Sequence, residues 1–109
     1  MTISDHQLDI AHAAAPNVKL YINEYDIEGG TGPKAAAFLN VVKKLLAQKK
    51  PLHGIGFQCH FVGGQVPAGL AAAMKTYSDL GLDVAITELD VRLPVSWSGT
   101  ASAANLQQQ

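Results

Sequence analysis

Apolar and polar residues alternate along this chain in two patterns, one typical of short strands and one typical of helices. Runs of strand-forming residues at 18–24, 54–58 and 84–87 predict three strands that recur about 30 to 35 residues apart. Between them, apolar residues recur at the spacing of an amphipathic helix. Segment 1–15 predicts a further short helix before the turn signal Pro16-Asn17. The pattern therefore predicts an α/β architecture.

Two longer helices are predicted between the strands. The first begins at Pro33, after a glycine-rich loop at 29–32, and ends before Pro51. The second begins at Pro67 and ends before Gly81, which is expected to form its C-terminal cap. The inward-facing residues of the two helices are expected to be Phe38, Val41, Val42, Leu45 and Leu46, and Leu70, Met74 and Tyr77.

One helix between successive strands is the connection of a β-α-β unit, so the three strands should be parallel. Parallel sheets carry their functional groups at the carboxyl ends of the strands. Each predicted strand ends in a polar cluster, and these clusters are residues 23–26, 58–60 and 88–90. We therefore expect one shared site at that end of the sheet.

The third cluster holds two carboxylates at the end of an apolar strand. Glu88 and Asp90 are two residues apart, so on an extended backbone they should point the same way. Gln58 and His60 share the same spacing and should lie beside them. The His60 imidazole can bond one carboxylate through each ring nitrogen, which would hold Glu88 for nucleophilic attack. The alternative is that these carboxylates are an ordinary solvated strand end with no catalytic role.

Composition narrows the class of protein. The chain has 109 residues, 48% of them hydrophobic and 16% charged, which is typical of one small globular domain. A formal charge of −1 gives no basic field, so neither a nucleic-acid partner nor a membrane partner is expected. The lone Cys59 excludes an internal disulfide and a zinc knuckle. No signal peptide is evident, so we expect an intracellular protein or a sequence whose true beginning lies upstream.

Three segments carry a resemblance to a known family. The runs Gly-Ile-Gly-Phe-Gln-Cys-His at 54–60 and Leu-Gly-Leu-Asp-Val-Ala-Ile-Thr-Glu-Leu-Asp-Val-Arg at 80–92 resemble the later strands of family 10 glycoside hydrolases, the endo-1,4-β-xylanases. Segment 16–26 resembles the fifth barrel strand of that family. The resemblance covers about residues 10–92, and it implies that residues 1–109 are a fragment of one catalytic domain. It implies a partial (β/α)8 barrel of about three parallel β-α units and retaining hydrolysis of β-1,4-xylan.

The resemblance also implies roles for individual residues. Glu88 matches the catalytic nucleophile of the family, His60 would hydrogen-bond it, and Asp90 would orient His60. Gln58 would contact sugar hydroxyls at the cleavage site, and Tyr25 would contact a sugar on the leaving-group side.

Five further positions depart from the family pattern or have a different expected role. Asp26 stands where the family usually has asparagine, which exchanges an amide donor for an acceptor and puts that sugar contact in doubt. Cys59 replaces the usual serine or threonine and is expected to pack away from the site. Glu24 matches the aspartate of an Asn-Asp-Tyr-Asn run and is expected to be structural, because the family's general acid lies one strand earlier. Trp97 is a candidate sugar platform, and no partner is evident for His53.

The resemblance further implies xylan or xylo-oligosaccharides as substrate, no metal or other cofactor, and secretion, because the polymer lies outside the cell. The chain would carry the nucleophile without the general acid and would be inactive alone. One alternative is a non-catalytic xylan-binding remnant that uses Tyr25, Gln58, His60 and Trp97. Another is a phosphate-binding α/β domain, whose glycine-rich loop the glycines at 29–32 and 63–64 match only loosely.

Overall fold

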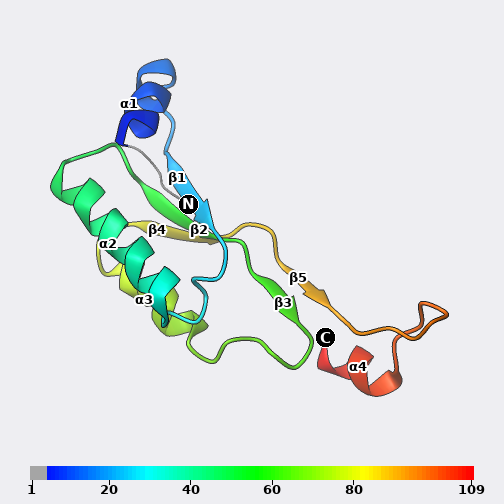
Figure 1. The fold of residues 1–109 in the computed structure, drawn as a ribbon. Coiled ribbons are helices and arrows are strands. Elements are labelled where there is room, and N and C mark those ends of the chain that lie inside the picture. Colours follow the sequence, from blue (N-terminus) through cyan, green and yellow to red (C-terminus); the bar gives the residue numbers. More distant parts are fainter. Residues whose placement is uncertain (1–4) are drawn as a thin grey trace.

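The computed structural model describes residues 5–109, in which the predicted helices and strands follow one another in the predicted order (Figure 1). The expected N-terminal helix is confirmed from Asp5, and its first four residues lie outside the described part. The elements are α1 (Asp5–Ala14), β1 (Tyr21–Glu24), α2 (Pro33–Ala47), β2 (Gly54–Phe57), β3 (His60–Val62), α3 (Leu70–Ser78), β4 (Asp83–Ile86), β5 (Asp90–Arg92) and α4 (Ala103–Gln108).

The three predicted strands form one parallel sheet in the order β1-β2-β4, as expected. The first strand begins at Tyr21, three residues later than predicted. The N–H of Val18 is used in a turn to the carbonyl of Ala15, and the N–H of Leu20 donates to Nδ1 of His53 at 2.9 Å. His53 therefore has a partner that the sequence did not reveal.

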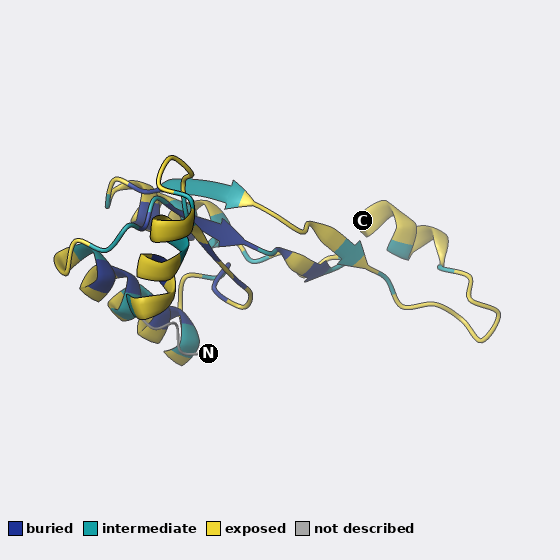
Figure 2. Ribbon diagram, turned by 90° about the horizontal axis from the view of Figure 1, so that it is seen from above, coloured by how far each residue is buried: buried dark blue, intermediate teal, exposed yellow. Residues whose placement is uncertain are grey.

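The two faces of the sheet differ. Ile22 and Phe57 lie on the face that α2 and α3 cover. The ring of Tyr77 on α3 packs against two other rings on this face, with its centroid 5.8 Å from that of Phe57 and 5.9 Å from that of Phe38. Burial of this apolar area is the main stabilising term of the fold. Figure 2 shows the buried residues gathered between the helices and the sheet. The core also includes Leu8, Ile27, Val42, Leu45, Leu52, Ile55, Cys59, Phe61, Ala73 and Leu82.

On the opposite face, side chains of β1 cross the middle strand. Tyr21 passes over Gly54 and donates its hydroxyl to Oδ2 of Asp83 on β4 at 2.7 Å. A Cβ atom on Gly54 would lie 2.6 Å from the Tyr21 ring, so only glycine leaves room for this crossing. Asn23 makes a second crossing, one pleat further along β1.

The helix boundaries follow from local chemistry. Pro33 is the first residue of α2, as predicted, because its missing N–H is not needed there. Helix α3 begins at Leu70 and not at Pro67, because Pro67 to Gly69 form a turn closed by a hydrogen bond from Leu70 N to Pro67 O. Helix α3 ends at Ser78, and Gly81 follows with a φ of +86°. Its N–H donates to the carbonyl of Ser78, and that of Leu82 donates to the carbonyl of Tyr77, so the glycine closes the end of the helix as predicted.

Two short strands were not predicted. β3 and β5 form a separate parallel pair that continues the paths of β2 and β4. Phe57 pairs with Ile86, but His60 pairs with Asp90, so two residues on one side face three on the other. This extra residue is a bulge, and it separates the two sheets.

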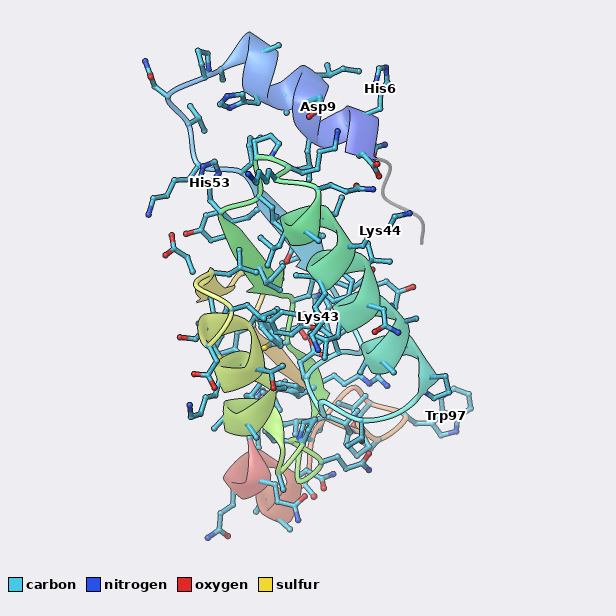
Figure 3. All side chains as sticks on the ribbon, turned by 90° about the vertical axis from the view of Figure 1, so that its left-hand side faces the viewer. His6, Asp9, Lys43, Lys44, His53 and Trp97 are labelled. Carbon is cyan, nitrogen blue, oxygen red and sulfur yellow. The ribbon has the colours of Figure 1, made fainter. Side chains whose placement is uncertain are left out.

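Helix α1 lies at the end of the sheet where the strands begin, near His53 (Figure 3). Leu8 is its buried residue, and Oδ2 of Asp9 forms an ion pair with Nζ of Lys50 at 2.6 Å. At the other end, residues 93–109 extend away from the main body, which gives a molecule of 50 × 27 × 21 Å (Figure 2). Within residues 5–109, no helix has the length and apolar character that crossing a membrane requires.

Candidate active site

The polar residues that follow β2 and β4 meet around one imidazole ring. Nδ1 of His60 lies 2.9 Å from Oδ2 of Asp90, and its Nε2 lies 3.1 Å from Oε2 of Glu88. The hydrogen bond to Asp90 raises the pKa of His60 above its ordinary value; burial opposes this shift, and the hydrogen bond to Glu88 adds to it. The arrangement in which each ring nitrogen faces one carboxylate is therefore present.

The bulge, and not simple strand alternation, produces this arrangement. Glu88 lies between β4 and β5, where the backbone is irregular. Its N–H donates to the carbonyl of Gln58 at 3.2 Å, and the N–H of Asp90 donates to that of Cys59 at 3.2 Å. Glu88 and Asp90 point toward the same ring, as predicted, but they do so across the bulge and not along one extended strand.

Asn23 belongs to the first of the predicted polar clusters, but its contact with Glu88 was not predicted. Its Nδ2 donates to Oε1 of Glu88 at 2.8 Å, while its Oδ1 accepts from the Thr87 hydroxyl at 2.7 Å. The two carboxylate oxygens of Glu88 therefore have different partners, Asn23 and His60. Gly56 makes the contact possible, because a Cβ there would lie 2.6 Å from Oδ1 of Asn23. The feature of the sequence that could have indicated this contact is an asparagine on β1 that pairs in register with a glycine, Gly56, on β2.

Glu24 lies on the other side of β1 and is only 3% exposed. Its Oε1 accepts the N–H of Tyr25 at 2.9 Å and lies 3.1 Å from Nζ of Lys34. A buried carboxylate with these partners is satisfied within the fold. Its contacts agree with the structural role expected from the sequence.

Tyr25 and Asp26 follow β1 on the same edge of the sheet as His60. The ammonium group of Lys34 lies 3.3 Å from the centroid of the exposed Tyr25 ring, which is a cation–π contact. Asp26 has a φ of +57° and lines, together with His60, a cleft of about 320 Å³. The other lining residues are Glu28, Gly29, Thr31, Phe61, Val62, Gln65 and Pro67.

Gln58 and Cys59 form the link between β2 and β3. Gln58 is partly buried, and its N–H donates to the carbonyl of Glu24 at 3.0 Å. Cys59 is fully buried, as expected for a residue that packs away from the site, and burial followed by the charge of Glu28 raises the pKa of its thiol. The N–H of Cys59 donates to Oε1 of Glu28 at 2.9 Å. Glu28 is a residue that the sequence did not single out.

Trp97 lies far from this cluster along the C-terminal segment. Its side chain is fully exposed and projects outward, as Figure 3 shows. The structure does not bring it together with Glu88 or His60. Across residues 5–109, no group of three or more histidine, cysteine, aspartate or glutamate side chains is arranged to hold a metal ion.

Parallel β-α units with carboxylates gathered at the carboxyl ends of the strands define a class of protein, the (β/α)8-barrel enzymes, and this chain supplies three such units. The family model for glycosyl hydrolase family 10 matches residues 5–109. The chain belongs to this family.

Relatives and solved structures agree with this assignment. The chain is 56% identical over 86 residues to endo-1,4-beta-xylanase A of Phanerodontia chrysosporium, which is 79% of this chain and 21% of that protein. It is 46% identical over 91 residues to an endo-1,4-beta-xylanase of Agaricus bisporus, or 82% of this chain and 27% of that protein. The structure of a GH10 xylanase from Bispora sp. MEY-1 with xylobiose superimposes with a TM-score of 0.80 at 39% identity, covering 93% of this chain and 30% of that one. The chain therefore spans well under half the length of these relatives.

Proposed function

We propose that residues 1–109 form part of one catalytic domain, an endo-1,4-β-xylanase that hydrolyses β-1,4-xylosidic bonds in xylan with retention of configuration. Membership of the family and the xylanase names of the relatives support the activity. The observation that carries the assignment of the site is the fixation of Glu88, whose two oxygens face Asn23 and His60.

In this proposal Glu88 is the nucleophile. Its carboxylate attacks the anomeric carbon as the glycosidic bond breaks, and a general acid from another part of the barrel protonates the leaving oxygen. Water then hydrolyses the glycosyl-enzyme ester and releases Glu88. His60 and Asn23 hold the plane of the carboxylate before attack, which removes part of the orientational cost of the reaction. Asp90 fixes the imidazole of His60 from its other nitrogen.

Substrate contacts are assigned to the residues around this centre. Gln58 would contact sugar hydroxyls at the cleavage point, and Tyr25 would contact a sugar on the leaving-group side. Asp26 lines the cleft beside His60 and offers that sugar an acceptor only. The substrate is xylan or a xylo-oligosaccharide, and the site as proposed uses no metal or other cofactor. We propose that the protein is secreted, because its polymeric substrate lies outside the cell.

The experiment uses a chimeric barrel, in which this chain replaces the matching segment of the Agaricus bisporus relative. Glu88→Gln should reduce kcat on xylan by at least about a thousandfold, because the covalent step is lost. Glu24→Gln, a matched change in the other strand-end glutamate, should lose far less.

A mechanism-based 2-fluoro-xyloside should also trap a covalent adduct, which peptide mass spectrometry would locate on Glu88. Normal turnover by the Glu88→Gln barrel, or an adduct on Glu24, would overturn the assignment.

A non-catalytic xylan-binding role is the second candidate. The fully exposed Trp97 favours it, because an exposed aromatic ring offers a flat apolar face on which a sugar can stack. Calorimetry of the 109-residue chain with xylohexaose, compared with Trp97→Ala, would detect it. Equal heats for both chains would exclude Trp97 as a platform.

A further inference from the structure

Glu28 is a buried carboxylate at the edge of the site with a partner of an unusual kind. It lies in the loop after β1 and is only 5% exposed. Its Oε1 accepts a hydrogen bond from the backbone N–H of Cys59, 31 residues further along the chain, at 2.9 Å. A buried carboxylate requires such donors, and hydrogen bonds from backbone N–H groups to an ionised acceptor are among the stronger ones.

Cys59 has a backbone conformation that its side chain disfavours. Its φ is +63°, in the left-handed region that residues with a Cβ rarely adopt. A non-glycine residue keeps such a conformation only when the surrounding structure holds it. The hydrogen bond from the N–H of Cys59 to Glu28 is one contact that can hold this conformation.

The turn at Cys59 controls where its two neighbours point. Gln58 precedes it and His60 follows it, and the turn is the point at which β2 ends and β3 begins. The carbonyl of Cys59 also accepts the N–H of Asp90 at 3.2 Å. A change of φ at Cys59 would therefore move His60 relative to both Glu88 and Asp90.

We propose that Glu28 is a positioning residue for the active site. It holds the left-handed turn at Cys59, and this turn aims the imidazole of His60 between Glu88 and Asp90. The role of the site itself rests on the proposed function above. Glu28 acts through the backbone and touches neither the nucleophile nor the reacting bond.

The first test follows the His60 ring by NMR pH titration in the 109-residue chain. In Glu28→Ala the pKa of His60 should fall toward its ordinary value, because the two carboxylates no longer face the ring. Glu28→Gln keeps an acceptor for the Cys59 N–H and should retain the raised pKa. This readout needs no activity, so it separates a failure of positioning from a failure of the xylanase proposal.

The second test is rescue by glycine. Glycine adopts positive φ without strain, so Cys59→Gly should make Glu28 dispensable. In the chimeric barrel, Glu28→Ala should lower kcat by roughly tenfold to a hundredfold, the cost of a misplaced catalytic group, with little change in KM. Adding Cys59→Gly should restore most of the lost kcat.

Leu45→Ala is the control, because Leu45 is buried on α2 and its loss weakens the fold without a direct contact to the turn. The folded fraction of this variant should keep its kcat. An unchanged kcat and an unchanged pKa of His60 in Glu28→Ala would overturn the proposal. If Glu28→Ala does not fold, a folded Glu28→Ala/Cys59→Gly variant supports the proposal, and an unfolded one overturns it.

Discussion

At the scale of single residues, the carboxylate of Glu88 is held from two sides by residues of different strands. Asn23 comes from β1 and His60 from β3, and each faces a different oxygen. Side chains fixed in this way are preorganised, so less of the binding energy is spent on orientation during the reaction. The site therefore depends on partners that lie far from Glu88 in the sequence.

Asn23→Ala should lower kcat of the chimeric barrel by about tenfold or more, because one oxygen of Glu88 loses its donor. Asn23→Asp should be worse, since it places a second carboxylate within hydrogen-bonding distance of the first. Steady-state kinetics on an aryl xyloside would measure both effects. Equal kcat values for wild type and Asn23→Ala would contradict this role.

The raised pKa of His60 predicts a pH dependence of stability. The folded chain binds this proton more tightly than the unfolded chain does, so the stabilisation is fully present below the ordinary pKa of 6.5. It is lost as the pH rises through the raised pKa of the folded state. The free energy of unfolding of wild type minus that of His60→Gln should therefore shrink over this range, as measured by urea denaturation at several pH values. A difference that grows with pH would contradict the assignment.

At the scale of elements, the three main strands, their parallel direction and the helices between them came largely from the local pattern of apolar residues. The sequence predicted three parallel strands and the helices between them, because those depend on the spacing of residues within each segment. It did not predict β3, β5 or the bulge. At the junction of β2 and β3, Cys59 has a left-handed conformation and its N–H bonds to a residue 31 positions away, and no local pattern encodes such a contact.

The same limit explains which site residues were found. His60, Glu88 and Asp90 were recognisable because acidic and imidazole side chains follow apolar runs at a spacing of two. The contact of Asn23 with Glu88 and the place of Glu28 were not predicted, because both appear only when β1 and its following loop lie against β2 and β4.

Gly56→Ala tests the crossing of Asn23 over β2. The added Cβ would lie 2.6 Å from Oδ1 of Asn23 and 2.9 Å from Cγ2 of Thr87, so the Asn23 side chain must move away from Glu88. We expect a loss of about 1 to 3 kcal/mol in stability and a fall in kcat similar to that of Asn23→Ala. Thermal unfolding and kinetics of the chimeric barrel would measure both.

Gly29→Ala is the matched control, since its Cβ would meet only Oγ1 of Thr31 at 4.0 Å. It should leave both properties nearly unchanged. A Gly56→Ala barrel as stable and active as the control would show that Asn23 does not need this gap.

At the scale of the whole molecule, the three-stranded sheet has two unpaired edges. β1 and β4 each have one neighbour in the sheet, and Ile86 and Leu89 near the site are exposed. In a closed (β/α)8 barrel both edges pair and the inner face is covered. The described part of the chain thus gives three units of an architecture whose site is shared among several strands.

The 109-residue chain alone should release little or no reducing sugar from xylan, because the proposed general acid belongs to another strand of the barrel. A reducing-sugar assay at several protein concentrations would measure this, with the chimeric barrel as the positive control. Turnover by the chain at the rate of an ordinary glycosidase would mean that it supplies its own acid, and Glu24 would then need to be reconsidered.

The two crossings over β2 have a consequence for engineering. Tyr21 and Asn23 lie across Gly54 and Gly56 and bond to groups on β4 or just after it, so the outer strands touch through gaps in the middle one. A library that varies β1 while keeping β4 fixed would mostly break these bonds. Productive changes in the surroundings of Glu88 should therefore arise as pairs of substitutions, one on each outer strand, with both glycines retained.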